Sequence, residues 1–391
     1  MTAAFPPGSL WGAATAAHQV EGGNVNNHYW EWEHAEQSPF AEPSGDACDS
    51  YHRWREDLDL VADAGLTAYR FSIEWSRIEP EEGEVSRAAV DHYRRIVDGC
   101  RDRGLTPLVT LSHFTTPRWF HRDGSWQGPN AGDRFARFTE LALPILEDAA
   151  YVVTINEPNL MACLPVLGRM GAQGEPIHGL PKPDQALTDA LLSAHCRSMD
   201  VLRSAGPFAA GLTLVGQEYL AEDGGEEQVA AYRGAMEDQF FDVAKGDDFV
   251  GMQIYSCTHI GPEGPRAGVD SEPTLAFMER RPQALGAAIT RAAEMVPGVP
   301  LVVTENGLAT ADDDDRIRFT ADALRSLAEA IAAGADVRGY THWSLLDNFE
   351  WMDGYRPTFG LVAVDRTTFA RTPKPSLAWL GEVARRNGLA G

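Results

Sequence analysis

Residues 151–158 read Tyr151-Val152-Val153-Thr154-Ile155-Asn156-Glu157-Pro158. The first half is an apolar, β-branched run, which is typical of a buried strand. Because the residue before a proline disfavours helical backbone angles, we expect Glu157 to lie at the carboxyl end of this strand. A carboxylate at that position is poorly explained as part of a hydrophobic core and well explained as part of a reactive site.

A second stretch has the same design. Leu301-Val302-Val303-Thr304 is again apolar and β-branched, and Glu305-Asn306-Gly307 follows it. Two strands that are far apart in the sequence therefore each present one glutamate at the carboxyl end. Paired carboxyl groups of this kind carry out glycoside hydrolysis.

Eight runs of strand type alternate with segments of helical spacing. The strands are expected at residues 10–14, 68–73, 106–111, 151–155, 208–214, 249–254, 301–304 and 337–343. Regular alternation predicts a parallel sheet, and eight units over this length predict a closed (β/α)8 TIM barrel of the α/β class. The competing fold, an open doubly wound sheet, usually carries a glycine-rich phosphate turn after its first strand, and Gly22-Gly23 is no such motif. We expect residues 1–391 to form a single domain.

Three local expectations concern the segments between the strands. A helix that begins near Tyr51 should end at Gly65, which suits a helix carboxyl cap. Asp133 should cap a helix in which Pro144 produces a kink. Residues 164–184 are rich in glycine and proline and are expected to form a long loop.

Composition excludes several classes of function. The formal net charge of −24 would repel nucleic acids and anionic membranes. The five cysteines, at positions 48, 100, 163, 196 and 257, show no paired spacing, so we expect no disulfide framework, no metal site and a reducing compartment.

Residues 1–7 show no signal-peptide pattern, and no apolar run is long enough to cross a membrane, so the expected location is the cytoplasm. The oligomeric state stays open.

Eight short motifs, in order along almost the whole chain, together resemble glycoside hydrolase family 1, the β-glucosidase family. They are Gln19-Val20-Glu21-Gly22, Arg70-Phe71-Ser72-Ile73-Glu74-Trp75, Leu111-Ser112-His113-Phe114, Thr154-Ile155-Asn156-Glu157-Pro158, Thr304-Glu305-Asn306-Gly307, the run from Trp343 to Trp351, Gly354-Tyr355 and Phe359-Gly360-Leu361. Any one of these motifs is a weak signal, whereas the ordered series is a strong one.

The resemblance implies a retaining β-glycosidase without a cofactor, acting on small β-glycosides. It makes Glu305 the nucleophile and Glu157 the acid/base, with Arg70, Asn156 and Tyr255 in support. The negative charge of Glu305 should raise the pKa of Glu157. When Glu305 is glycosylated, this charge disappears, and Glu157 can then ionise and act as a base. The resemblance also implies a cis peptide bond between Trp343 and Ser344. The implied substrate-binding residues are Gln19, His113, Asn156, Trp343, Glu350, Trp351 and Phe359.

Glu350 and Glu157 narrow the substrate class. Members of the family that act on 6-phosphorylated sugars lack the glutamate at position 350, so the resemblance favours an unphosphorylated glucoside, with β-galactosidase or β-fucosidase side activity. The plant thioglucosidases of the family carry glutamine at the acid/base position, so Glu157 favours an O-glycosidase. A transglycosylase with the same intermediate and a catalytically inactive sugar-binding domain stay as alternatives.

The chain departs from the family pattern at three places. Gln253 and Ile254 stand where the family has asparagine and tyrosine, which leaves the contact of Gln253 with the site open. Residues 164–181 do not resemble the usual loop, and the chain is shorter than typical members. Four aspartates, Asp312 to Asp315, either attract a cationic leaving group or lie favourably at a helix amino terminus.

Overall fold

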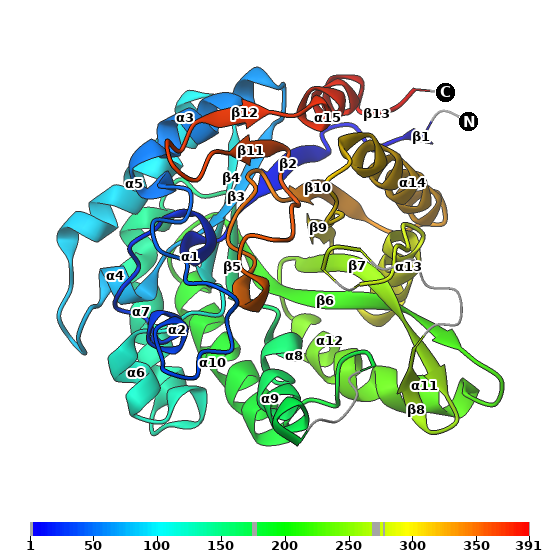
Figure 1. The fold of residues 1–391 in the computed structure, drawn as a ribbon, viewed down its shortest axis with the longest axis horizontal. Helices are drawn as coiled ribbons and strands as arrows, with labels where there is room; N and C mark the ends of the chain where they lie inside the picture. Colours follow the sequence, from blue (N-terminus) through cyan, green and yellow to red (C-terminus); the bar gives the residue numbers. More distant parts are fainter. Residues whose placement is uncertain (1–2, 174–177, 268–273, 277, 391) are drawn as a thin grey trace.

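The computed structural model describes residues 3–173, 178–267, 274–276 and 278–390, and its centre is a closed ring of parallel strands (Figure 1). Each strand pairs with the next along the chain, β10 pairs with β2, and β6 pairs with β7, so the ring has no open edge. The predicted (β/α)8 barrel is therefore confirmed. The ring strands are β2 (Leu10–Ala14), β3 (Ala68–Ser72), β4 (Thr106–Ser112), β5 (Tyr151–Asn156), β6 (Ala209–Ala221), β7 (Val250–Gly261), β9 (Leu301–Glu305) and β10 (Val337–Trp343).

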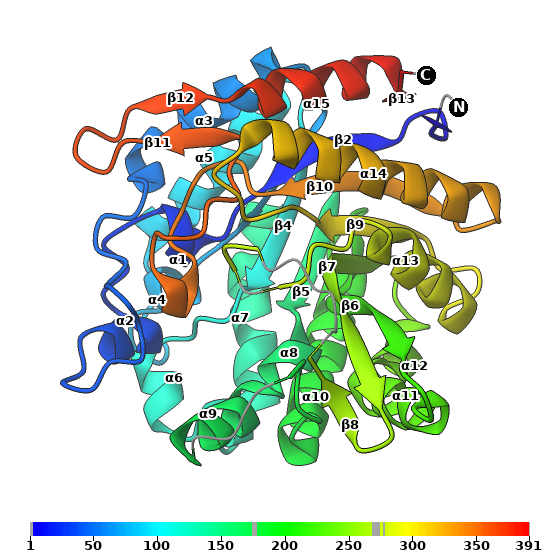
Figure 2. The same cartoon turned by 45° about the vertical axis from the view of Figure 1, so that its right-hand side comes forward.

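Helices cover the outside of the ring, as Figures 1 and 2 show. The long ones are α3 (Ser50–Asp63), α5 (Arg87–Asp102), α7 (Ala131–Leu146), α10 (Gln185–Arg203), α13 (Ala284–Met295), α14 (Asp313–Ala332) and α15 (Pro375–Arg386). The shorter ones are α1 (Ala17–Val20), α2 (His28–Glu33), α4 (Trp75–Ile78), α6 (Arg118–Arg122), α8 (Pro158–Met161), α9 (Leu164–Gln173), α11 (Glu226–Arg233) and α12 (Gln239–Ala244). None of the helices within these described ranges is long and apolar enough to cross a membrane.

The interior of the ring is filled at its amino-terminal end. Ala68, Leu108, Val153 and Val302 come from four different strands and contact one another and Phe249, and all five side chains are buried. Removing apolar surface of this kind from water is the main favourable term in folding. The barrel is thus closed at one end by a hydrophobic layer, and polar chemistry is confined to the other end.

Strands β6 and β7 are longer than the sequence predicts. They were expected to end at residues 214 and 254, and they continue to Ala221 and Gly261. Their pairing continues beyond the ring, from Glu218 opposite Cys257 to Ala221 opposite Ile260, and β8 (Gly264–Arg266) adds an antiparallel partner to β7. These contacts between strands stabilise the extension, and they leave no local periodicity in the sequence.

Two further expectations need correction. Residues 164–173 of the predicted loop form helix α9, and Leu167 packs against a buried cluster around Tyr232 and Ile260 that supports it. Residues 174–177 lie outside the described part. Asp133 is not the cap of its helix, because α7 begins at Ala131, and Pro144 lies inside the last turn of that helix.

A buried ion pair joins α3 to β12 (Arg371–Pro373), which pairs with β11 (Val362–Val364). Arg371 donates two hydrogen bonds to Asp57, at 2.8 and 3.2 Å, and both side chains are 1% exposed. Arg101 and Asp148 form a comparable pair on the surface, with side chains 53% and 48% exposed. The two pairs differ mainly in burial.

We expect Asp57→Ala to lower the free energy of unfolding by about 3–5 kcal/mol, because it leaves the guanidinium of Arg371 buried without its carboxylate. The matched change Asp148→Ala should cost less than about 1 kcal/mol, because water screens the exposed pair. Urea unfolding of both variants measures the difference. Equal losses of stability would contradict this assignment.

Candidate active site

A cavity of about 460 Å³ opens at the carboxyl ends of the barrel strands, and both expected catalytic glutamates line it. Glu305 is the last residue of β9, and Glu157 directly follows β5. The other expected site residues that line this cleft are Gln19, His113, Tyr255, Trp343, Glu350, Trp351 and Phe359. Arg70 pairs with Glu305, and Asn156, which directly precedes Glu157, accepts hydrogen bonds from Arg70 and Gln253.

Glu305 is held by three donors. Arg70 pairs with Oε1, and the amide nitrogen of Gln253 donates to the same oxygen at 2.9 Å. The hydroxyl of Tyr255 donates to Oε2 at 2.5 Å. Both oxygens of the carboxylate are therefore oriented, as a carboxylate that acts in one fixed direction requires.

The guanidinium of Arg70 also organises the neighbouring strands. It is fully buried on β3, and Nη2 donates to Oδ1 of Asn156 at 2.5 Å. Gln253 donates to that oxygen too, at 2.7 Å, so its amide links Asn156 to Glu305. The contact that the sequence left open for Gln253 thus exists, and one amide reaches both neighbours.

Glu157 has a different environment. Its backbone is in the left-handed region, with φ +47°, where it precedes helix α8. A non-glycine residue in this region is strained, and such strain is concentrated at functional sites. Among the described residues, no hydrogen bond reaches its carboxyl group, although the side chain is buried.

These environments separate the two carboxyl groups electrostatically. Burial raises the pKa of Glu157 well above its usual value, and the charge of Glu305 raises it further, while Arg70 opposes both. Burial raises the pKa of Glu305 as well, but the Arg70 charge and the Tyr255 hydrogen bond lower it. Only Glu305 has direct partners that favour the charged form, so Glu157 is the group that keeps the proton.

A second set of polar groups forms the opposite wall. Glu350 accepts hydrogen bonds from the indole of Trp343 at 3.2 Å and from the amide of Gln19 at 3.3 Å. Burial raises the pKa of Glu350 to about 8. The peptide bond between Trp343 and Ser344 is cis, as the family resemblance implies. A Cβ atom at Gly307 would lie 2.0 Å from the carbonyl oxygen of Trp343, so only glycine fits after Glu305-Asn306.

Aromatic rings complete this wall. His113 lies 5.9 Å from Trp343 and 6.2 Å from Trp351 between ring centroids, in near-parallel planes. Burial and the charge of Arg70 lower the pKa of His113 well below its usual value, so its imidazole is neutral. Phe359 packs edge-on against Tyr255 at 5.9 Å.

The cleft is also lined by residues that the sequence did not assign to the site. They are Gln217, Ser256, Cys257, Met278, Glu279, Met352 and Asp353, among others. Several of them lie on the extension of β6 and β7 or on the segment after β8. Only Met352 and Asp353 had a signal in the sequence, since they directly follow the Glu350-Trp351 motif.

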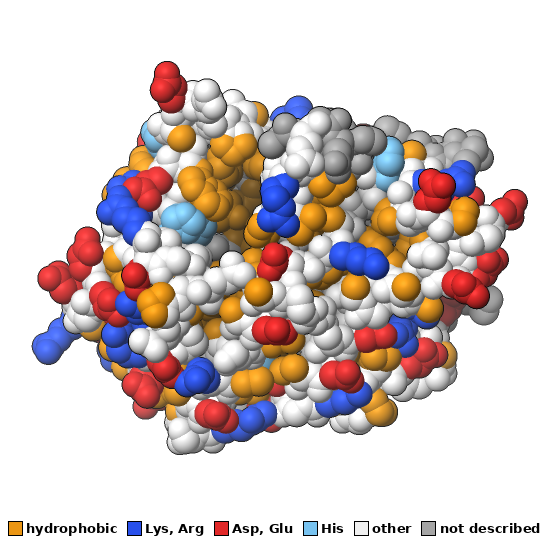
Figure 3. Space-filling view, turned by 90° about the horizontal axis from the view of Figure 1, so that it is seen from below, with side chains coloured by type: hydrophobic (Ala, Val, Ile, Leu, Met, Phe, Trp, Pro, Cys, Tyr) orange, Lys and Arg blue, Asp and Glu red, His pale blue; other side chains and the backbone are white. Residues whose placement is uncertain are grey.

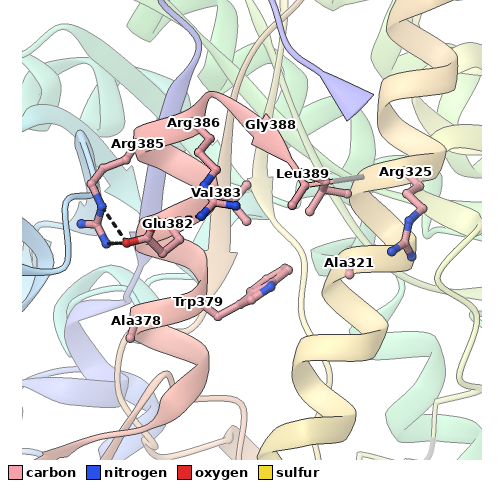
Figure 4. Close-up of a pocket in the computed structure, with 11 residues that line it drawn as sticks. Ala321, Arg325, Ala378, Trp379, Glu382, Val383, Arg385, Arg386, Gly388 and Leu389 are labelled. Carbon is pink, nitrogen blue, oxygen red and sulfur yellow. Dashed lines mark hydrogen bonds and ion pairs between the residues drawn. The ribbon is translucent and has the colours of Figure 1, made fainter. Parts of the chain in front are cut away.

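A second cavity, also of about 460 Å³, lies between α14 and α15 near the carboxyl terminus (Figure 4). It shares no residue with the cleft. Among its described lining residues the one carboxylate is that of Glu382, which is paired with Arg385 at 2.7 Å. A paired and solitary carboxylate cannot supply an acid and a nucleophile together, so the chemistry belongs to the cleft at the strand ends.

The aspartate run begins a helix. Asp312 precedes α14, and its side chain accepts hydrogen bonds from the backbone of Asp314 at 3.0 Å and of Asp315 at 3.3 Å. Its neighbours lie in the first turn, where negative charge is favourable.

On the face drawn in Figure 3, acidic and basic side chains are interspersed, and a hollow with hydrophobic side chains on its walls opens among them.

Comparison with known proteins gives a consistent result. The family model "Glycosyl hydrolase family 1" matches residues 1–232 and 265–389. The thermostable beta-glucosidase B of Thermobispora bispora is 35% identical over 440 positions, which cover 98% of this chain and 91% of the relative. The bifunctional beta-D-glucosidase/beta-D-fucosidase of Bifidobacterium breve is 30% identical, with 97% of this chain and 98% of the relative covered. The crystal structure of beta-glycosidase BGL167 matches with a TM-score of 0.90 at 42% identity, and the match covers 99% of this chain and 98% of that one.

The first alignment is longer than the 391 residues of this chain, so the relative contains insertions, and the chain is indeed short. The barrel, the order of its motifs and these extended matches agree. The chain is a glycoside hydrolase and belongs to glycosyl hydrolase family 1.

Proposed function

We propose that this enzyme is a retaining β-glucosidase that hydrolyses unphosphorylated β-D-glucosides, with Glu305 as the nucleophile and Glu157 as the acid/base. The observation that carries the proposal is the unequal environment of the two carboxyl groups in one cleft. Arg70, Gln253 and Tyr255 all bind Glu305, and no described side chain hydrogen-bonds to Glu157. Two carboxyl groups with separated pKa values can divide the work of glycoside hydrolysis, and in a double displacement the charged group is the nucleophile and the protonated group is the acid.

In the first step, a carboxylate oxygen of Glu305 attacks the anomeric carbon. The bond from that carbon to the leaving oxygen breaks, and Glu157 transfers its proton to this oxygen. The product is a glycosyl ester on Glu305, and the charge of Glu305 is lost. The pKa of Glu157 then falls, because the charge that helped to raise it has disappeared.

In the second step, Glu157 is the base. It removes a proton from a water molecule, and the water oxygen attacks the anomeric carbon. The ester bond to Glu305 breaks, which restores the carboxylate on Glu305 and the proton on Glu157. One electrostatic coupling thus prepares Glu157 for both half-reactions.

Three buried polar atoms at the cleft support the binding of sugar hydroxyls. Oε1 of Gln19, Nδ1 of His113 and Nδ2 of Asn156 have no hydrogen-bond partner within the described part of the chain. An unpaired buried polar atom costs about 1–3 kcal/mol, and a hydroxyl group that pairs with it recovers this cost. We assign Asn156 to the 2-hydroxyl and Gln19 and His113 to the 3- and 4-hydroxyls.

The remaining sugar contacts come from the segment after β10. Trp351 joins Gln19 and His113 at the 3- and 4-hydroxyls, and Glu350 binds the 4- and 6-hydroxyls. Trp343, with Phe359 nearby, offers an apolar platform for the CH face of the ring. The described lining of the cleft contains no lysine or arginine, which supports an unphosphorylated sugar.

Three further assignments concern the side activities, the domain organisation and the location of the enzyme. The name of the Bifidobacterium breve relative supports a β-fucosidase side activity, and we keep β-galactosidase beside it. We propose one catalytic domain over residues 1–391, because the family match covers residues 1–232 and 265–389 and both parts contribute strands to one ring. We also propose a cytoplasmic location, because all five cysteines are free thiols.

Removing either carboxyl group should strongly lower turnover. Glu157→Ala should lower kcat on a glucoside with a poor leaving group by about 10²–10⁴, the usual contribution of a general acid/base, and Glu305→Ala should lower it further. Azide should restore Glu157→Ala on a nitrophenyl β-glucoside, because that leaving group needs no acid and azide needs no base. In the wild type, NMR of the first product should show the β configuration. A first product of α configuration would overturn the double displacement.

The pH profile should report both groups. Activity requires a charged Glu305 and a protonated Glu157, so kcat/KM should fall at acidic pH as Glu305 gains a proton and at alkaline pH as Glu157 loses one. Glu157→Gln should remove the alkaline decline on an activated substrate. Tyr255→Phe should move the acidic decline to higher pH, because it removes a hydrogen bond that lowers the pKa of Glu305. A shift to lower pH in Tyr255→Phe would contradict the assignment.

The preference for glucosides over xylosides should depend on Glu350. A β-xyloside lacks the 6-hydroxymethyl group, and a neutral hydrogen bond is worth about 0.5–1.5 kcal/mol, whereas one to a charged group is worth about 1.5–3 kcal/mol. Because the pKa of Glu350 is about 8, Glu350 is neutral at pH 6 and charged at pH 9. The kcat/KM for the glucoside divided by that for the xyloside should therefore rise from roughly 3- to 10-fold at pH 6 to roughly 10- to 100-fold at pH 9.

The titration of Glu157 and Glu305 affects kcat/KM for both substrates equally, so its effect cancels in this ratio. Glu350→Gln, which cannot ionise, is the matched control and should give a ratio that does not change with pH. A 6-phosphoglucoside should react more slowly than the plain glucoside throughout. Preference for the phosphorylated sugar would show that the substrate class is wrong.

A further inference from the structure

Three side chains with metal-binding atoms meet on the outer wall of the cleft. Cys257 and His259 lie on the extension of β7, and Glu279 lies after β8. The distance from Sγ of Cys257 to Nε2 of His259 is 3.8 Å, and Nε2 lies 2.8 Å from Oε2 of Glu279. All three ligand atoms lie within 4.8 Å of one another, so one ion can contact all of them.

The second nitrogen of His259 is also held. Nδ1 lies 2.7 Å from Oε1 of Glu222, the residue that follows β6. A carboxylate on the outer nitrogen of a histidine is the usual arrangement behind a metal-binding imidazole, because it fixes the ring and the tautomer that leaves Nε2 free to bind. The cluster thus contains both the ligands and the group that orients one of them.

The backbone around the cluster is fixed by contacts of its own. His259 pairs with Leu220 in the register of β6 and β7. The hydroxyl of Ser256 donates to the carbonyl oxygen of Glu279 at 2.9 Å, which ties the segment after β8 to β7. Arg281 pairs with Glu218 at 2.8 Å across the same junction. The three ligands are therefore held on supported segments rather than on independent loops.

We propose that Cys257, His259 and Glu279 form a binding site for one divalent transition-metal ion such as Zn²⁺. A thiolate, an imidazole and one carboxylate suit zinc, whereas calcium and magnesium prefer sites made of oxygen atoms. The side chains of His259 and Glu279 are 16% and 19% exposed, so an ion can reach them. Three protein ligands leave further coordination positions to water or a substrate group.

An ordinary ion pair is the competing explanation. A protonated His259 between Glu222 and Glu279 accounts for both short contacts of the ring. In that arrangement the thiol of Cys257 is only a weak hydrogen-bond partner of Glu279, whereas in a metal site the same sulfur is a third ligand. The spacing of these residues matches no zinc motif, because Glu279 is far from the other two in sequence and only the fold brings it near.

The site would place a cation on the wall of the cleft. Cys257 and Glu279 line the same cavity as Glu157 and Glu305, and they lie on its outer part. The ion would also join β7 to the segment after β8. This proposal does not depend on the assignment of the sugar or of the catalytic glutamates.

Cobalt binding tests the site directly, because Co²⁺ can replace Zn²⁺ and has a visible spectrum. Addition of Co²⁺ to the metal-free full-length protein should produce a sulfur-to-cobalt charge-transfer band that saturates at one ion per chain. Cys257→Ser and His259→Gln should abolish the band. Cys196→Ser is the matched control, because Cys196 is exposed on α10 and far from the cluster in sequence, and this variant should keep the band.

Two further measurements separate binding from damage to the fold. Glu222→Gln should keep the band and weaken Zn²⁺ binding by about 10- to 100-fold, since it changes only the group behind the imidazole. Zn²⁺ should raise the unfolding temperature of the wild type and of Cys196→Ser but not of Cys257→Ser, each variant first being checked for a native circular dichroism spectrum. A wild type without the band, or a Cys257→Ser variant that keeps it, would overturn the proposal and leave His259 as an ion-paired residue.

Discussion

Arg70 has no exposed surface, and its guanidinium needs an anionic partner inside the barrel. Glu305 is that partner, and Asn156 accepts a second hydrogen bond from the same cation. Taking a charged pair out of water is costly, and removing one member leaves the other uncompensated. The ends of β3, β5 and β9 are therefore held in one arrangement by a single buried cation, and the cleft depends on it.

The chemistry follows from the asymmetry of this arrangement. Arg70, the amide of Gln253 and the hydroxyl of Tyr255 all bind Glu305, whereas Glu157 is affected only by burial and by the charges of Glu305 and Arg70. Burial raises both pKa values, so the direct partners decide which group stays charged. The strained backbone of Glu157 belongs to the same arrangement, because it turns the chain from β5 into α8 at the position where the proton is needed.

The outer cleft is built differently from the inner one. The sugar end uses residues at the ends of the ring strands, whereas the outer wall uses the extension of β6 and β7 and the segment after β8. Cys257 and His259 lie on this paired extension, and Glu279 joins them from the segment after β8.

The sequence by itself determined the ring strands and the placement of Glu157, Glu305 and Arg70 on or directly after them. Apolar β-branched runs favour strands locally, and the proline after Glu157 ends its strand, so neither signal depends on distant residues. Only the tertiary structure decided that Gln253 reaches both Asn156 and Glu305, that α9 replaces part of a loop, and that β6 and β7 continue beyond the ring. Those features depend on contacts between segments distant in sequence, and such contacts leave no periodic pattern. The meeting of Glu279 with Cys257 and His259 has the same cause, since the fold alone sets the distance between them.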